Sequence, residues 1–71
     1  MKIQNYSRVR LLVDAYSQEG VSIDAIGYVI EVYPDEKYEV EFSDEHGITI
    51  AQIVLGSEEI IIAEKGDGKP A

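Results

Sequence analysis

The residues best suited to chemistry lie in the segment DEHG, residues 44–47. Here the imidazole of His46 follows the carboxylates of Asp44 and Glu45, a combination that can bind a cation or tune a general base. The chain has no second histidine and no cysteine to complete a transition-metal site. Two acids and a histidine before a glycine are also typical of a solvated turn. We favour the turn.

Glu39 and Glu41, in the segment KYEVEFS of residues 37–43, are the second candidate. Alternate side chains of a strand point the same way, so these two lie roughly 7 Å apart along the chain. That separation is near the spacing of the two carboxylates of inverting glycosidases. Such a pair also needs a cleft and a binding wall, which a convex sheet face does not offer. We therefore interpret both residues as the solvated side of a strand.

Other catalytic patterns are missing from the sequence. No serine lies in a Gly-x-Ser-x-Gly segment, and no glycine-rich phosphate loop with its lysine occurs. The alternating oxygen ligands of an EF-hand are absent as well. We therefore predict a protein that is not an enzyme, with no catalytic residue, no metal site and no cofactor.

The charge balance points to the class of partner. Fourteen Asp and Glu face six Lys and Arg, a formal net charge of −8 in 71 residues. A field of this sign repels phosphate backbones and acidic membranes and attracts basic proteins. It also keeps a small protein in solution, which is the plainer interpretation. Because the chain lacks cysteine and an apolar signal sequence, we expect a cytoplasmic protein.

Hydrophobic alternation and turn residues predict five short strands, over residues 8–14, 26–33, 37–43, 48–55 and 58–63. Residues 15–25 form a long loop with room for one helical turn. Pro34 and Asp35 suit the centre of one tight turn, and Gly47 suits a positive φ in the next. Val29 and Val32 are three apart, so a bulge or strong twist near Ile30 and Glu31 would be needed to turn both inward, unless both faces of the strand are buried.

These elements predict an all-β fold of one domain, a small barrel or sandwich over residues 8–63. Residues 1–7 then form a lead-in, and residues 64–71, rich in glycine and charge, a flexible tail. Closing the sheet into a barrel protects the strand edges. If closure is incomplete, the apolar strand over 48–55 or 58–63 is exposed, so we expect a monomer or an edge-strand dimer.

The segment DAIGYVIEVY, residues 24–33, resembles the Gly-x-Val-x-x-Val core of KOW-type SH3-like domains, with Gly27, Val29 and Val32 at the matching positions. Residues 8–62 are similar to a family of small uncharacterised bacterial proteins. The resemblance implies a five-stranded SH3-like barrel with a long loop after the first strand.

The same resemblance supplies the alternative function. KOW domains often bind RNA or ribosomal protein through basic loops, so a nucleic-acid or ribosome-associated module is the second hypothesis. In this chain only Lys2, Arg8 and Arg10 form a basic cluster. Signalling SH3 domains bind proline-rich peptides through a Trp-bearing groove, and this chain has no Trp.

Five tyrosines suggest an interaction surface, because Tyr buries area and keeps a polar group. In an SH3-like barrel, the loop that holds Tyr16 and the strand end that holds Tyr33 can meet at one end. With Glu31, Glu39 and Glu41 nearby, these residues are our predicted site for a basic protein partner, as in an accessory or inhibitory protein of antitoxin or immunity type. The alternative is that the tyrosines cover the thin core and the carboxylates only confer solubility.

Overall fold

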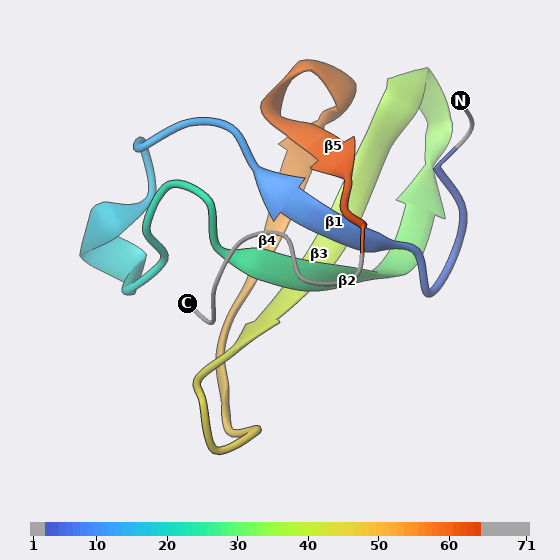
Figure 1. Ribbon diagram of the computed structural model, residues 1–71. Coiled ribbons are helices and arrows are strands. Elements are labelled where there is room, and N and C mark those ends of the chain that lie inside the picture. Colours follow the sequence, from blue (N-terminus) through green and yellow to red (C-terminus); the bar gives the residue numbers. More distant parts are fainter. Residues whose placement is uncertain (1–2, 65–71) are drawn as a thin grey trace.

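The computed structural model describes residues 3–64 as one antiparallel sheet of five strands (Figure 1). Their order in the sheet is β4-β3-β2-β1-β5. The strands are β1 (Arg8–Leu11), β2 (Ile26–Tyr33), β3 (Lys37–Ser43), β4 (Thr49–Gly56) and β5 (Ile60–Ile62), joined in part by the 3₁₀ turns η1 (Ser17–Glu19), η2 (Pro34–Glu36) and η3 (Ser57–Glu59). The predicted all-β class with five strands is confirmed. Residues 65–71, most of the predicted tail, lie outside the described residues.

The predicted strands match best in the middle of the chain. β2 and β3 have the expected bounds, and β4 is shifted by one residue. β1 ends at Leu11 rather than at residue 14, because the loop after it folds back and Asp24 donates its N–H to the Leu11 carbonyl. This loop contains η1, the single helical turn that its length allowed.

The final predicted strand, over residues 58–63, is too long at its start. Ser57–Glu59 instead form η3, and β5 covers only Ile60–Ile62. The reason is local, since the Glu59 carboxylate accepts the Gly56 N–H at 2.9 Å and so closes a turn. Acidic residues in a first helical turn are favourable for the same reason.

The predicted bulge in β2 is confirmed, but of the two valines expected to turn inward only Val29 is buried, while Val32, near the end of the strand, is 41% exposed. Val29 faces Val40 and Glu31 faces Glu39, which leaves Ile30 as the extra residue. Beside the bulge, Val29 accepts the Tyr6 N–H at 2.6 Å and donates its own N–H to Ser7 at 3.0 Å. The end of the expected lead-in over residues 1–7 is therefore hydrogen-bonded to the sheet.

The core lies inside the curved sheet. Alternation along β3 buries Tyr38, Val40 and Phe42. The loop after β1 adds Val21 and Ala25, both fully buried. The long loop is therefore part of the packing, and the other buried members come from every strand, among them Val9, Leu11, Val29, Leu55 and Ile60.

The two hairpin turns differ in how well the sequence predicted them. Gly47 has a φ of 81°, as expected for the turn between β3 and β4. In η2, the two residues with positive φ are Asp35 and Glu36, at 64° and 57°, so the left-handed pair lies one residue later than the expected centre at Pro34 and Asp35. Two consecutive left-handed residues match the twist of the flanking strands, as in primed hairpin turns.

Candidate functional site

Four of the five predicted partner-binding residues share one surface of the sheet. Because β3 turns Tyr38, Val40 and Phe42 inward, Glu39 and Glu41 point outward. Glu39 faces Glu31 of β2 and Val54 of β4, while Glu41 faces Tyr28. We use the term outer face for the side chains of Tyr28, Glu31, Tyr33, Glu39, Glu41 and Val54.

Two hydrogen bonds fix the carboxylates of the outer face. The Tyr33 hydroxyl donates to Glu39 Oε1 at 2.6 Å, and the Thr49 hydroxyl donates to Glu41 Oε2 at 2.6 Å. The hydrogen bond to Glu39 raises the pKa of Tyr33, because only the protonated phenol can donate to the carboxylate. Desolvation and the charges of Glu39 and Glu31 raise this pKa as well. These side chains are therefore held in place at the surface.

Like charges meet directly on this surface. Glu31 and Glu39 are cross-strand partners, an arrangement that destabilises a sheet. Within residues 3–64, no Lys or Arg forms an ion pair with Glu31, Glu39 or Glu41. The outer face thus carries three carboxylates without an ion pair among the described residues, with Lys37 on the same side of β3 opposite Tyr33.

The sequence prediction missed two apolar members of the outer face. Tyr28 is 49% exposed and Val54 is 52% exposed, one on each side of β3. Alternation within one strand cannot show that these two residues lie beside Glu39 and Glu41, because that depends on the register of the three strands. Together they add apolar area beside the carboxylates, a mixture that is common in protein interfaces.

Tyr16, the fifth predicted residue, lies in a different setting. Its hydroxyl donates to Glu59 Oε2 at 2.8 Å, and its ring packs against the core. This bond is the main cause that raises the pKa of Tyr16, followed by burial and by the charges of Glu59 and its acidic neighbours. Tyr16 and Tyr33 thus have separate partners, and Tyr16 connects the loop after β1 to η3.

Replacing Tyr16 with phenylalanine is expected to lower the free energy of unfolding by about 1 kcal/mol, because one partly buried hydrogen bond to a carboxylate is lost. Since the folded pKa of Tyr16 lies above its ordinary value of 10.0, the bond contributes fully below pH 10.0 and is lost as pH rises through the folded pKa. Urea unfolding at neutral and alkaline pH measures both effects. Equal stability of Tyr16→Phe and the native chain at neutral pH would contradict this role.

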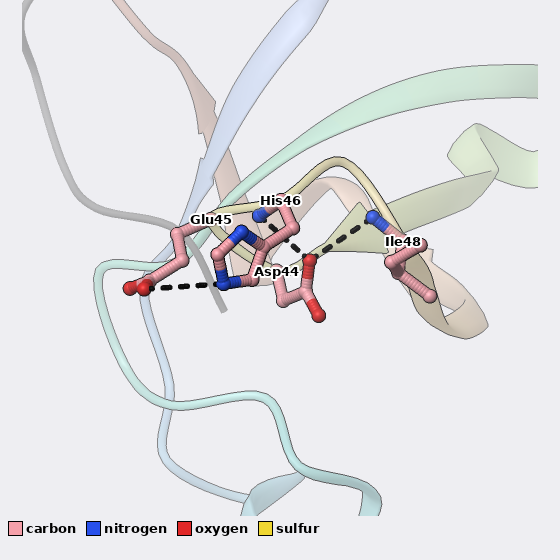
Figure 2. A network of polar contacts seen from close by, with 4 residues as sticks. All are labelled: Asp44, Glu45, His46 and Ile48. Atoms are coloured by element: carbon pink, nitrogen blue, oxygen red, sulfur yellow. Dashed lines mark hydrogen bonds and ion pairs between the residues drawn. The ribbon is translucent and has the colours of Figure 1, made fainter.

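The segment around His46 is a hairpin turn (Figure 2). Asp44 Oδ1 accepts the main-chain N–H groups of His46 at 2.8 Å and Ile48 at 3.0 Å. The imidazole Nε2 lies 3.6 Å from Glu45 Oε2, and both side chains are 76% exposed. In the part of the chain that the structure describes, no group of three His, Cys, Asp or Glu is placed to hold a metal. The carboxylate of Asp44 shapes the turn.

Two members of the basic cluster behind the nucleic-acid hypothesis have partners within the protein. Arg10 forms an ion pair with Asp24 at 2.9 Å. Arg8 donates to the main-chain oxygen of Glu64. Lys2, its third member, lies outside the described residues.

Comparison with known proteins identifies the family of the chain. Neither a curated protein nor a solved structure gave a match to this sequence. Over residues 3–64, the structure contains no helix with the length and apolar character needed to cross a membrane. The family model described as Domain of unknown function (DUF4926) matches residues 5–62, from just before β1 to the end of β5. This chain belongs to that uncharacterised family.

Proposed function

We propose that the protein is a non-enzymatic interaction module whose outer face binds a basic segment of a protein partner. The observation that carries the proposal is the grouping of Glu31, Glu39 and Glu41, with Tyr28 and Val54 exposed beside them. Lysine or arginine side chains of a partner would relieve the repulsion between Glu31 and Glu39. The exposed apolar side chains would add buried area to the same contact.

The net charge of −8 supports the same proposal, because it accelerates encounter with basic proteins. A protein of this kind acts as an accessory or inhibitory subunit that covers a basic surface of its partner, as antitoxin or immunity proteins do. The cytoplasm is the proposed compartment, on the basis of the cysteine-free sequence.

We also propose an SH3-like barrel as the finer description of the fold. The strand order, the long loop after β1 and the 3₁₀ turn between β4 and β5 support it. We do not extend the proposal to nucleic-acid binding, because Arg8 and Arg10 bind within the protein and the net charge opposes phosphate.

Neutralising the outer face is the test of function. A partner captured by crosslinking in cells is purified, and its affinity is measured by calorimetry for the native chain and for the triple variant Glu31→Gln, Glu39→Gln, Glu41→Gln. We expect at least about a tenfold loss of affinity, since charge-assisted contacts are lost. A partner without a basic surface, or an unchanged affinity, contradicts the proposal.

A matched variant separates local contact from net charge. Asp14→Asn, Glu19→Gln, Glu45→Gln changes the net charge equally, at exposed positions away from the outer face. We expect it to weaken binding only about threefold or less, mainly through slower association. Equal losses for the two triple variants would mean that the outer face has no special role.

The repulsion between Glu31 and Glu39 yields a separate prediction. Glu31→Lys is expected to raise the free energy of unfolding by roughly 0.2–1 kcal/mol, because opposite charges replace like charges across the strands. The same change is expected to weaken binding of the basic partner. Thermal unfolding and calorimetry measure the two effects, and Asp14→Lys at an exposed position in the loop after β1 is the control. A variant that loses stability contradicts the pairing.

A further inference from the structure

A groove of about 780 Å³ follows the strand β5, at the end of the sheet. Ile3, Tyr38 and all three residues of β5, Ile60–Ile62, line it, and the acids Glu36 and Glu64 line it as well. None of these residues belongs to the outer face. The groove is within the usual range of ligand-binding pockets, roughly 300–1,000 Å³, and its lining is mainly apolar.

Within residues 3–64, β5 is paired along one edge only. It pairs with β1 and with no other strand of the described residues (Figure 1). Arg10 faces Ile61, while Leu12 donates its N–H to Glu59 and Ala63 donates its N–H to Arg8. Because hydrogen bonding alternates along an antiparallel pair, Ile61 turns its polar main-chain groups toward β1. The C=O of Ile60 and both groups of Ile62 then point away from β1.

These main-chain groups and the groove match the requirements for adding a strand. In strand addition, the main chain of an extended peptide forms hydrogen bonds with an unpaired strand edge, and pockets beside that edge take alternate side chains of the peptide. Of the groove-lining residues that the structure describes, two are acidic and none is basic, in a chain of net charge −8. A second copy would bring the same negative charge to this edge, whereas a basic segment is attracted.

We propose that β5 and its groove bind an extended segment of a partner protein, with alternating apolar and basic side chains, as an added strand. The segment pairs with Ile62 and with the C=O of Ile60. Its apolar side chains contact the isoleucines, and its basic side chains face Glu36 and the acidic surroundings. This surface is separate from the outer face, so each proposal can fail without the other.

The peptide acetyl-KVKVKVK-amide is the probe for this edge, with the full-length chain labelled for NMR. On saturation with the peptide, we expect amide hydrogen exchange at Ile62 to slow at least about tenfold, because its N–H gains an acceptor. Exchange at Ile61, which already bonds β1, should slow less, because its N–H gains no new acceptor and only the added stability of the bound state acts on it. Unchanged exchange at Ile62, or protection confined to the outer face, overturns the proposal.

N-methylated peptides test whether the main-chain N–H groups of the peptide form hydrogen bonds with the protein. One version carries N-methyl groups on its central lysines and another on its valines, so each blocks one edge of the added strand. We expect one version to lose at least about tenfold in affinity and the other to bind like the parent. Equal binding of all three peptides overturns strand addition and leaves only attraction between charges.

Protein variants distinguish the two surfaces. Glu36→Gln is expected to lower the affinity for the peptide about threefold to tenfold. Glu31→Gln on the outer face is expected to leave that affinity within about twofold of the native value. The reverse order overturns the proposal. Protection of the Ile62 amide without peptide also overturns it. If that protection is independent of protein concentration, the chain itself covers the edge. If the protection rises with protein concentration, a second copy covers the edge.

Discussion

Replacing Gly27 with alanine is expected to abolish the stable fold. A Cβ at this position would lie 2.6 Å from Val40 Cγ1, 2.9 Å from Phe42 Cδ1 and 2.8 Å from the main-chain oxygen of Glu41. The side chains can shift, but the oxygen belongs to β3, which is paired with β2 at this point. Overpacking of this kind costs about 3 kcal/mol or more, a large part of the stability of a small domain.

Urea unfolding followed by circular dichroism measures the loss at Gly27, and Gly47→Ala is the control. Gly47 has a φ of 81° with open space around its Cα, so alanine there introduces backbone strain without a clash. We expect that control to cost about 1 kcal/mol. A Gly27→Ala protein as stable as Gly47→Ala would show that β2 and β3 do not approach so closely.

Truncating Phe42 to alanine is expected to cost about 3–5 kcal/mol, because it leaves a cavity in the centre of the core. Phe42 is the largest of the fully buried side chains and packs where β2, β3 and β4 meet. For a domain of 71 residues, that loss leaves much of the protein unfolded at room temperature.

The comparison for Phe42 uses one conservative and one exposed position. Phe42→Leu retains most of the apolar volume and is expected to cost about 1–2 kcal/mol, while Val54→Ala on the outer face should be within about 0.5 kcal/mol of the native chain. Melting temperatures from calorimetry rank the variants. A Phe42→Ala protein that melts close to the Val54→Ala protein would contradict a core centred on Phe42.

Local patterns predicted the middle of the fold well. Alternation defined β3, and the spacing of Val29 and Val32 indicated the bulge in β2. The chain after Leu11 also looks strand-like, yet Leu11 bonds to Asp24 and Ala25 in the loop and Leu12 donates its N–H to Glu59, so strand β1 ends at Leu11. The three isoleucines of β5 have no alternation, and the side chain of Glu59 sets where that strand begins. Such bonds depend on contacts that no local pattern contains.

Only part of the candidate site could be predicted from the sequence. Parity along the strand predicted the outward direction of Glu39 and Glu41, and Glu31 joins them through the register of β2 with β3. Tyr16 could not be placed from the sequence, because its partner Glu59 is 43 residues away along the chain. The position of β5 at the end of the sheet, with no second strand partner among residues 3–64, likewise follows from strand order, which appears only when the sheet is assembled.

The single extra residue at Ile30 sets the phase of β2. Before it, Tyr28 points outward, and after it Glu31 and Tyr33 do, although side chains three apart in a regular strand point to opposite sides. Excising that one residue would invert the second half of the strand, turning the carboxylate of Glu31 and the phenol of Tyr33 toward the inner side and Val32 toward the outer side. Which side chains lie on the outer face thus depends on the position of the bulge as much as on the residue types.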